Sequence, residues 1–223
     1  MIRRAPPPVL IVTDATLEDV AIERVLSEAL RTIARGSVWV QLRDKLREAA
    51  SLAAFAARLR SLTRRLGAGF MINGDPALAV SLDADGVHLG GGAGPISTAR
   101  RLVGAARWIT IAAHSDEDVV AARAAGADGV LVSPVFVTPG KGRPRGVAAL
   151  RSARRSAGDL AVYALGGVDA SNARSCVEAG ADGVAVIRAI FAAKDPSGEM
   201  ARIVAAVQSG VSFTSPAVKR NGR

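Results

Sequence analysis

The 223-residue sequence has a single cysteine and no long apolar run. One cysteine, Cys176, excludes an internal disulfide, and its place in a helical pattern predicts a core residue in a reducing, cytoplasmic setting. No uninterrupted apolar stretch reaches the length of a membrane span, and the residues before Pro6 lack the apolar core of a signal peptide. The sequence therefore predicts a cytoplasmic protein without a membrane partner.

Aromatic residues are also scarce, at 4% of the chain, although hydrophobic residues reach 49%. Proteins that bind single-stranded nucleic acid stack its bases on aromatic side chains, and this chain has few of these. No run of basic residues is interleaved with aromatic residues. The formal net charge of +9 comes largely from arginines on predicted helix faces. We interpret these arginines as a solvated surface, and we expect no nucleic-acid partner.

Short apolar runs alternate with amphipathic helical stretches along most of the chain. Six runs predict strands at 9–13, 38–42, 69–72, 87–89, 108–111 and 130–135, and two more lie within Leu160–Phe191. Alternation with short links predicts a parallel sheet, and eight such units predict an α/β fold closed into a (βα)8 TIM barrel. We expect one barrel domain at 9–208, between a Pro-rich lead-in at 1–8 and a disordered tail at 209–223.

The tetrapeptide Ala-Asp-Gly-Val occurs three times, each time between a predicted helix and the next strand. Glycine suits the tight turn that this junction needs. Such turns lie at the end of a barrel opposite the active face. We therefore expect the three aspartates to be structural: Asp85, Asp128 and Asp182.

Candidate site residues follow the ends of the predicted strands, where barrels place their active sites. Gln41, Arg43 and Lys45 alternate along one strand end and so share one face. The other candidates are Asp14, Asn73, Asp75, His88, His114, Ser133, Thr138, Lys141, Gly166, Gly167, Ile187 and Arg188. The set is cationic and rich in backbone donors, which suits a substrate with two phosphates, or one phosphate and a carboxylate.

Several of these residues also have a purely structural interpretation. Residues 41–45 could form an ordinary solvent-exposed surface, and residues 138–141 could form an ordinary mobile loop. Each histidine could be a hydrogen-bonded residue of the core. No cluster of histidine, cysteine and carboxylates has the spacing of a zinc site. An aldolase-type barrel would place a lysine on an inner strand, and the predicted strands lack one. An unrelated phosphate-binding isomerase barrel stays open as an alternative.

Several motifs, in order through residues 9–205, resemble the thiamine phosphate synthase/TenI family. They are Q-L-R-D-K, I-N-G-D, D-G-V-H-L-G, A-A-H-S, S-P-V-F-V-T-P-G-K, L-G-G-V and A-G-A-D-G-V-A-V-I-R-A-I. The synthases join hydroxymethylpyrimidine diphosphate to a thiazole phosphate and release pyrophosphate. The TenI branch includes tautomerases that act on a carboxylated thiazole phosphate. The resemblance thus implies an enzyme of thiamine biosynthesis with small phosphorylated heterocycles as partners.

The resemblance also implies roles for individual residues. Gln41 would contact the pyrimidine, while Arg43, Asn73 and Lys141 would hold the diphosphate, with Lys45 and Thr138 nearby. The thiazole phosphate would lie against Gly166 and Gly167 and the backbone around Val186 and Ile187. No catalytic residue is assigned, and a homo-oligomer stays open.

Four positions depart from the family's patterns. Where the synthases have carboxylates that bind Mg²⁺, this chain has Gly74 and Ala93. Ala112 replaces a serine of the family, and Pro134 stands where the tautomerases have a histidine. Mg²⁺ needs oxygen ligands that these positions do not supply, which leaves Asp75 as a weak substitute and makes an Mg²⁺ cofactor doubtful. Three readings remain within the family: a divergent synthase, a TenI-like enzyme, and a non-catalytic binder of thiazole or thiamine phosphate.

Overall fold

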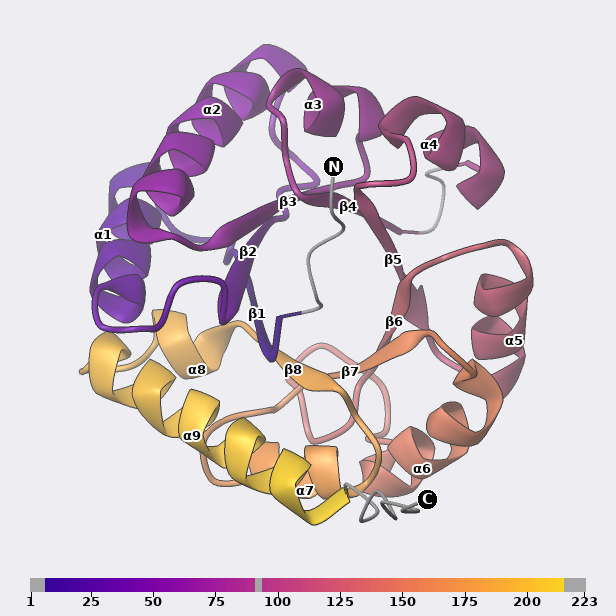
Figure 1. The fold of residues 1–223 in the computed structure, drawn as a ribbon. Helices are drawn as coiled ribbons and strands as arrows, with labels where there is room; N and C mark the ends of the chain where they lie inside the picture. The colour runs from indigo at the N-terminus through magenta and orange to yellow at the C-terminus, as the bar shows by residue number, and fades with distance from the viewer. Residues whose placement is uncertain (1–6, 91–93, 215–223) are drawn as a thin grey trace, which may run out of the picture.

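The computed structural model describes residues 7–90 and 94–214. Eight parallel strands pair in sequence order, and β8 pairs with β1 to close the ring. Helices surround this ring on its outer side, as Figure 1 shows. The arrangement confirms the predicted (βα)8 TIM barrel.

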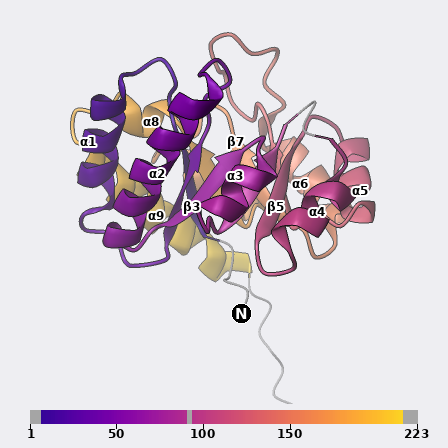
Figure 2. The ribbon, with the colours of Figure 1, turned by 90° about the horizontal axis from the view of Figure 1, so that it is seen from above.

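The strands are short and almost wholly buried, because helices cover their outer face and side chains fill the inner face. They are β1 Val9–Val12, β2 Val38–Leu42, β3 Gly69–Asn73, β4 Gly86–Leu89, β5 Trp108–Ala113, β6 Gly129–Val132, β7 Ala161–Leu165 and β8 Gly183–Val186. Their carboxyl ends meet on one side of the ring, where the loop after β6 rises above the barrel (Figure 2).

One helix follows each strand, except that two follow β8. They are α1 Asp19–Leu30, α2 Ala49–Leu66, α3 Pro76–Ser81, α4 Ile96–Val103, α5 Asp116–Ala124, α6 Gly146–Ala157, α7 Ala173–Glu178, α8 Arg188–Phe191 and α9 Pro196–Thr214. Local signals set several ends: Ser115 and Asp118 form a capping box on α5, and Gly67, at φ 74°, ends α2. Within the described ranges, no helix has the length and apolar character needed to cross a membrane.

One predicted boundary is wrong. Helix α9 continues to Thr214, beyond the predicted end of the domain at 208, so the first part of the predicted tail is helical. The helix stays ordered there because it packs on α7: a Cβ at Gly210 would lie 2.8 Å from Cβ of Val177. The remainder of the predicted tail, 215–223, and lead-in residues 1–6 lie outside the described residues.

Large aromatic side chains fill the barrel interior near the strand starts. Trp39 and Trp108 meet edge to face, with ring centroids 6.3 Å apart, and Tyr163 belongs to the same buried cluster. Inward glycines make room for them, since a Cβ at Gly69 would lie 2.5 Å from the Trp39 ring. Side chains alternate along a strand, so the next inward position on β2 is Gln41, and polar residues begin there.

The three repeated turns lie at the strand-start end and form the same contacts. Each aspartate accepts a hydrogen bond from the second residue of the preceding strand and pairs with an arginine of the helix before that strand. The sets are Asp85 with Phe70 and Arg60, Asp128 with Ile109 and Arg100, and Asp182 with Val162 and Arg154. These Arg–Asp braces bind helices to strands, as expected for structural aspartates. Cys176, also expected in the core, is fully buried.

Candidate functional site

Two adjoining cavities open where the strands end. The central cavity, about 240 Å³, is lined by residues at the ends of all eight strands. The side cavity, about 380 Å³, lies over the ends of β7 and β8. They share a wall formed by Thr138, Lys141, Leu165, Gly166 and Ile187. Two ligands could therefore meet along this wall.

Polar side chains from β2 and β3 form part of the central cavity's lining. Nε2 of Gln41 donates to Oδ1 of Asn73 at 3.3 Å, and the Gln41 side chain is only 1% exposed. Its other amide atom, Oε1, has no hydrogen-bond partner among the described residues. A buried amide oxygen without a partner costs about 1–3 kcal/mol, so this atom favours a ligand that donates to it.

His88 of β4 also lines the central cavity and is buried. Its Nδ1 lies 2.9 Å from Oγ1 of Thr110 on the neighbouring strand. Burial, together with the positive charges of Arg43 and Lys45, lowers the pKa of His88 to about 4. The ring is therefore neutral near pH 7, with one nitrogen as donor and the other as acceptor.

Three cationic side chains line the central cavity: Arg43, Lys45 and Lys141. None of them has a carboxylate partner in the part of the chain that the structure describes. The backbone of Arg43 is fixed because its N–H donates to Oγ1 of Thr13, which in turn donates to the Arg43 carbonyl. Unpaired cations in one cavity are suited to a strongly anionic ligand.

The loop after β6 packs on the glycines that follow β7. Strand β6 ends at Val132 rather than at 135, because Pro134 has no N–H for the ladder. The N–H of Phe136 donates to the Gly166 carbonyl at 2.9 Å, and a Cβ at Gly167 would lie 2.6 Å from the Val137 carbonyl oxygen. Only glycine fits this approach, which holds the start of the loop beside the shared wall.

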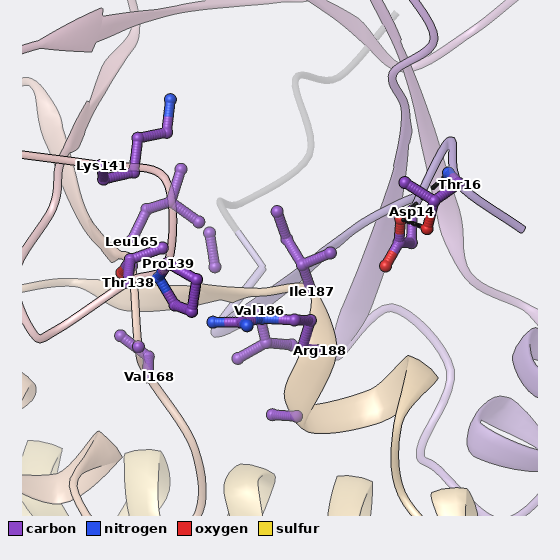
Figure 3. Close-up of a pocket in the computed structure, with 14 residues that line it drawn as sticks. Asp14, Thr16, Thr138, Pro139, Lys141, Leu165, Val168, Val186, Ile187 and Arg188 are labelled. Atoms are coloured by element: carbon purple, nitrogen blue, oxygen red, sulfur yellow. Dashed lines mark hydrogen bonds between the residues drawn. The ribbon is translucent and has the colours of Figure 1, made fainter.

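The side cavity is rich in backbone donors. Among the described residues, no acceptor is found for the N–H groups of Gly166, Gly167 and Val168, all of which line it. Arg188 extends its side chain toward the Thr138–Pro139 side of the cavity, as Figure 3 shows. Convergent N–H groups and a guanidinium form a suitable site for a phosphate group.

Most of the candidate residues come together in these cavities. The central cavity is lined by Gln41, Arg43, Lys45, Asn73, His88, His114, Thr138, Lys141, Gly166 and Ile187, and the side cavity adds Gly167 and Val186. Asp75 lines neither cavity: its Oδ1 accepts from the Leu78 N–H at 2.9 Å and caps helix α3. His114 is exposed, and its Nδ1 lies 3.1 Å from the Ser133 carbonyl oxygen.

Arg188, a candidate from its place at the end of the last predicted strand, lines the side cavity at the start of α8. The predicted set did not include Thr110. Thr110, the partner of His88, lies inside a strand, and the sequence carries no signal for their contact because it depends on the pairing of β4 with β5.

The described residues do not suit Mg²⁺. No Asp or Glu lines the central cavity, and no group of His, Cys, Asp and Glu in the described ranges could hold a metal ion. Asp44 pairs with Arg47, and Asp14, in the side cavity, accepts from the Thr16 hydroxyl. Residues 91–93 are Gly-Gly-Ala in sequence and supply no carboxylate. Mg²⁺ sites in proteins are usually built on carboxylates, and the described lining of the central cavity offers only neutral amide and hydroxyl oxygens beside its cations.

Known proteins resemble this chain along most of its length. A family model described as thiamine monophosphate synthase matches residues 9–190. The chain is 37% identical to a thiamine-phosphate synthase of Chloroflexus aurantiacus, covering 83% of this chain and 85% of the relative. It is 40% identical to one of Thermus thermophilus, covering 79% and 85%.

Solved structures agree with these sequence matches. Thiamine phosphate pyrophosphorylase from Pyrococcus furiosus superposes with a TM-score of 0.77 at 28% identity, covering 91% of this chain and 96% of that one. Orotidine 5'-phosphate decarboxylase from Pyrococcus horikoshii shares only the fold, with a TM-score of 0.67 at 17% identity over 89% of this chain and 99% of that one. The chain belongs to the thiamine monophosphate synthase family.

Proposed function

We propose that this chain catalyses the thiamine phosphate synthase reaction, in which a pyrimidine diphosphate and a thiazole phosphate are joined. The observation that carries the proposal is the pair of anion-suited cavities with a common wall. A tautomerase acts on one heterocycle and needs one such cavity, whereas a synthase needs two that touch. Family membership supports the same reaction.

The pyrimidine diphosphate occupies the central cavity in this proposal. Oε1 of Gln41, which lacks a partner among the described residues, accepts from the pyrimidine, and Arg43 and Lys141 hold the diphosphate. The thiazole phosphate occupies the side cavity, against the free N–H groups of Gly166 and Gly167 and the Arg188 guanidinium. The thiazole ring then lies along the shared wall, beside the pyrimidine methylene.

The reaction needs little from side-chain acids or bases. The C–O bond between the methylene and the diphosphate breaks, and the diphosphate leaves with the electron pair. The thiazole nitrogen donates its lone pair to the electron-poor methylene carbon and forms the new C–N bond. Arg43 and Lys141 stabilise the charge on the leaving group, while the neutral His88 adds no competing positive charge to the methylene.

The test is product formation by the full chain. Purified protein is incubated with both heterocycles, and thiamine phosphate and pyrophosphate are assayed, with and without Mg²⁺. We expect the two products in equal amounts. Their absence under both conditions, from a protein that is folded by circular dichroism, rejects the synthase proposal.

A second candidate is a non-catalytic binder of thiazole phosphate. It is favoured by Ala112, which lines the central cavity with a methyl group where the resemblance implies a serine, and by Pro134 where a tautomerase has histidine. Calorimetry with thiazole phosphate separates the two candidates. Tight binding without product supports the binder, whereas product supports the synthase.

A further inference from the structure

We propose that the central cavity takes the diphosphate group as the metal-free anion, with Arg43, Lys45 and Lys141 in the place of Mg²⁺. The inference rests on the proposed function, because it concerns the diphosphate of the same substrate. In this inference, positively charged side chains of the protein, and not a bound metal ion, neutralise the negative charge of the diphosphate.

The described lining carries positive charge and no negative charge. Its polar side chains are cations, amides, hydroxyls and imidazoles, and none is a carboxylate. The nearby carboxylates are engaged elsewhere: Asp44 with the Arg47 guanidinium at 2.9 Å, and Asp75 with the first turn of α3. A divalent cation entering this cavity would meet like charges without a carboxylate ligand, which is unfavourable.

The three cations are available to a ligand. Arg43 is half-buried, Lys45 and Lys141 are exposed, and none of the three forms an ion pair within the described residues. They come from two walls, the end of β2 and the loop after β6, so a diphosphate between them is contacted from both sides. Arginine offers paired N–H donors to phosphate oxygens, and lysine acts as a point charge.

His88 lies within the positive electrostatic potential of the cavity. Burial is the largest cause of its low pKa, and the charges of Arg43 and Lys45 lower it further. The positive potential of these two side chains therefore extends to the buried His88 ring. A potential that disfavours one proton on His88 disfavours a divalent cation more strongly and favours an anion.

The experiment measures binding of inorganic pyrophosphate to the full chain by calorimetry, in EDTA and in excess Mg²⁺. We expect binding in EDTA at least as tight as in Mg²⁺, because Mg²⁺ competes with the protein for pyrophosphate. Tighter binding in Mg²⁺, or no binding in EDTA, overturns the inference. The readout does not depend on turnover.

Two variants identify the cations responsible. Arg43→Gln and Lys141→Gln should each weaken binding in EDTA by about tenfold, the value of one charge-assisted hydrogen bond. Arg65→Gln is the matched control, since it removes an exposed cation from the last turn of α2 that lines neither cavity. Equal losses in all three variants would show a general charge effect and contradict the assignment.

The product assay separates this inference from the proposed function. Thiamine phosphate formed in EDTA supports both. Metal-free pyrophosphate binding without product supports the cationic site and rejects the synthase. Product that forms only with Mg²⁺ supports the synthase and overturns the metal-free site.

Discussion

Gln41 and Asn73 are joined across neighbouring strands by a hydrogen bond of 3.3 Å, which leaves Oε1 of Gln41 buried without a partner among the described residues. Amide groups buried in this way reduce stability. The unsatisfied Gln41 amide lies at the end of β2, in a cavity whose cations have no carboxylate partner within the described ranges, and this supports our proposal that the position serves a ligand.

Gln41→Leu should separate stability from binding. Leucine fills a similar volume without the unsatisfied oxygen, so we expect the free energy of unfolding to stay equal or rise by about 1 kcal/mol. Affinity for the pyrimidine diphosphate should fall by about tenfold or more, since the amide contact is lost. Urea denaturation and calorimetry on the same preparation check both. A variant that loses stability while keeping affinity would contradict this assignment.

Gly167→Ala should cost both stability and thiazole-phosphate binding. The added Cβ would lie 2.6 Å from the Val137 carbonyl oxygen, and φ is 64°, so we expect a loss of about 1–3 kcal/mol. Gly74→Ala is the control, because its φ of 82° carries a similar backbone cost, whereas its Cβ meets no atom within 4 Å. Thermal unfolding should rank Gly167→Ala as the less stable variant, and only that variant should bind thiazole phosphate more weakly.

Asp128→Ala should destabilise the barrel more than Asp182→Ala. The Asp128 side chain is 7% exposed and that of Asp182 is 42% exposed, although both accept from a strand N–H and pair with an arginine. Breaking the buried pair should cost about 3–5 kcal/mol, and breaking the exposed one about 1 kcal/mol. Chemical denaturation measures both losses. The reverse order would mean that burial does not determine the strength of these braces.

His88 should make the protein less stable as the pH falls from about 6.5 to about 4. Its pKa in the folded chain is about 4, below its ordinary value near 6.5, so the unfolded chain takes up the proton first. The stability from neutral His88 is present above pH 6.5 and is lost toward pH 4, by about 3 kcal/mol at most. In His88→Gln, the free energy of unfolding should change less between pH 6.5 and pH 4 than in the unsubstituted protein. Denaturant midpoints measured across this pH range provide the check. If the midpoints of the two proteins fall by the same amount, the prediction is wrong.

Arg188→Gln should weaken the binding of thiazole phosphate by about tenfold, with less effect on the unphosphorylated thiazole alcohol. The reason is that Arg188 lines the same cavity as the N–H groups of Gly166 and Gly167, for which no acceptor is found among the described residues, and has no ion-pair partner there either. Arg188→Lys should recover part of the affinity, because it restores charge without the paired donors. Calorimetry with both ligands provides the measurement, and equal losses for the two would argue against a phosphate contact.

Much of this structure could be predicted from sequence because the barrel follows from local patterns. Strand–helix alternation predicts the ring, and closure brings the polar residues after each strand to one end, so Arg43 and Lys141 line one cavity although they are far apart in the chain.

The features that escaped prediction depend on particular tertiary contacts. The sequence offers Asp75 as a weak metal ligand, yet its carboxylate accepts from the Leu78 N–H and caps α3. The polar stretch that begins at Ser209 suggested a tail, but Gly210 packs on Val177 and keeps α9 helical. Contacts of this kind outweigh local composition.

The Arg–Asp braces have a consequence for how such a barrel can diverge. They join helices to strands at the end of the barrel remote from both cavities. Substitutions in the loops after the strands therefore leave these anchors intact. A barrel of this kind can change the residues around its cavities without first having to rebuild the scaffold.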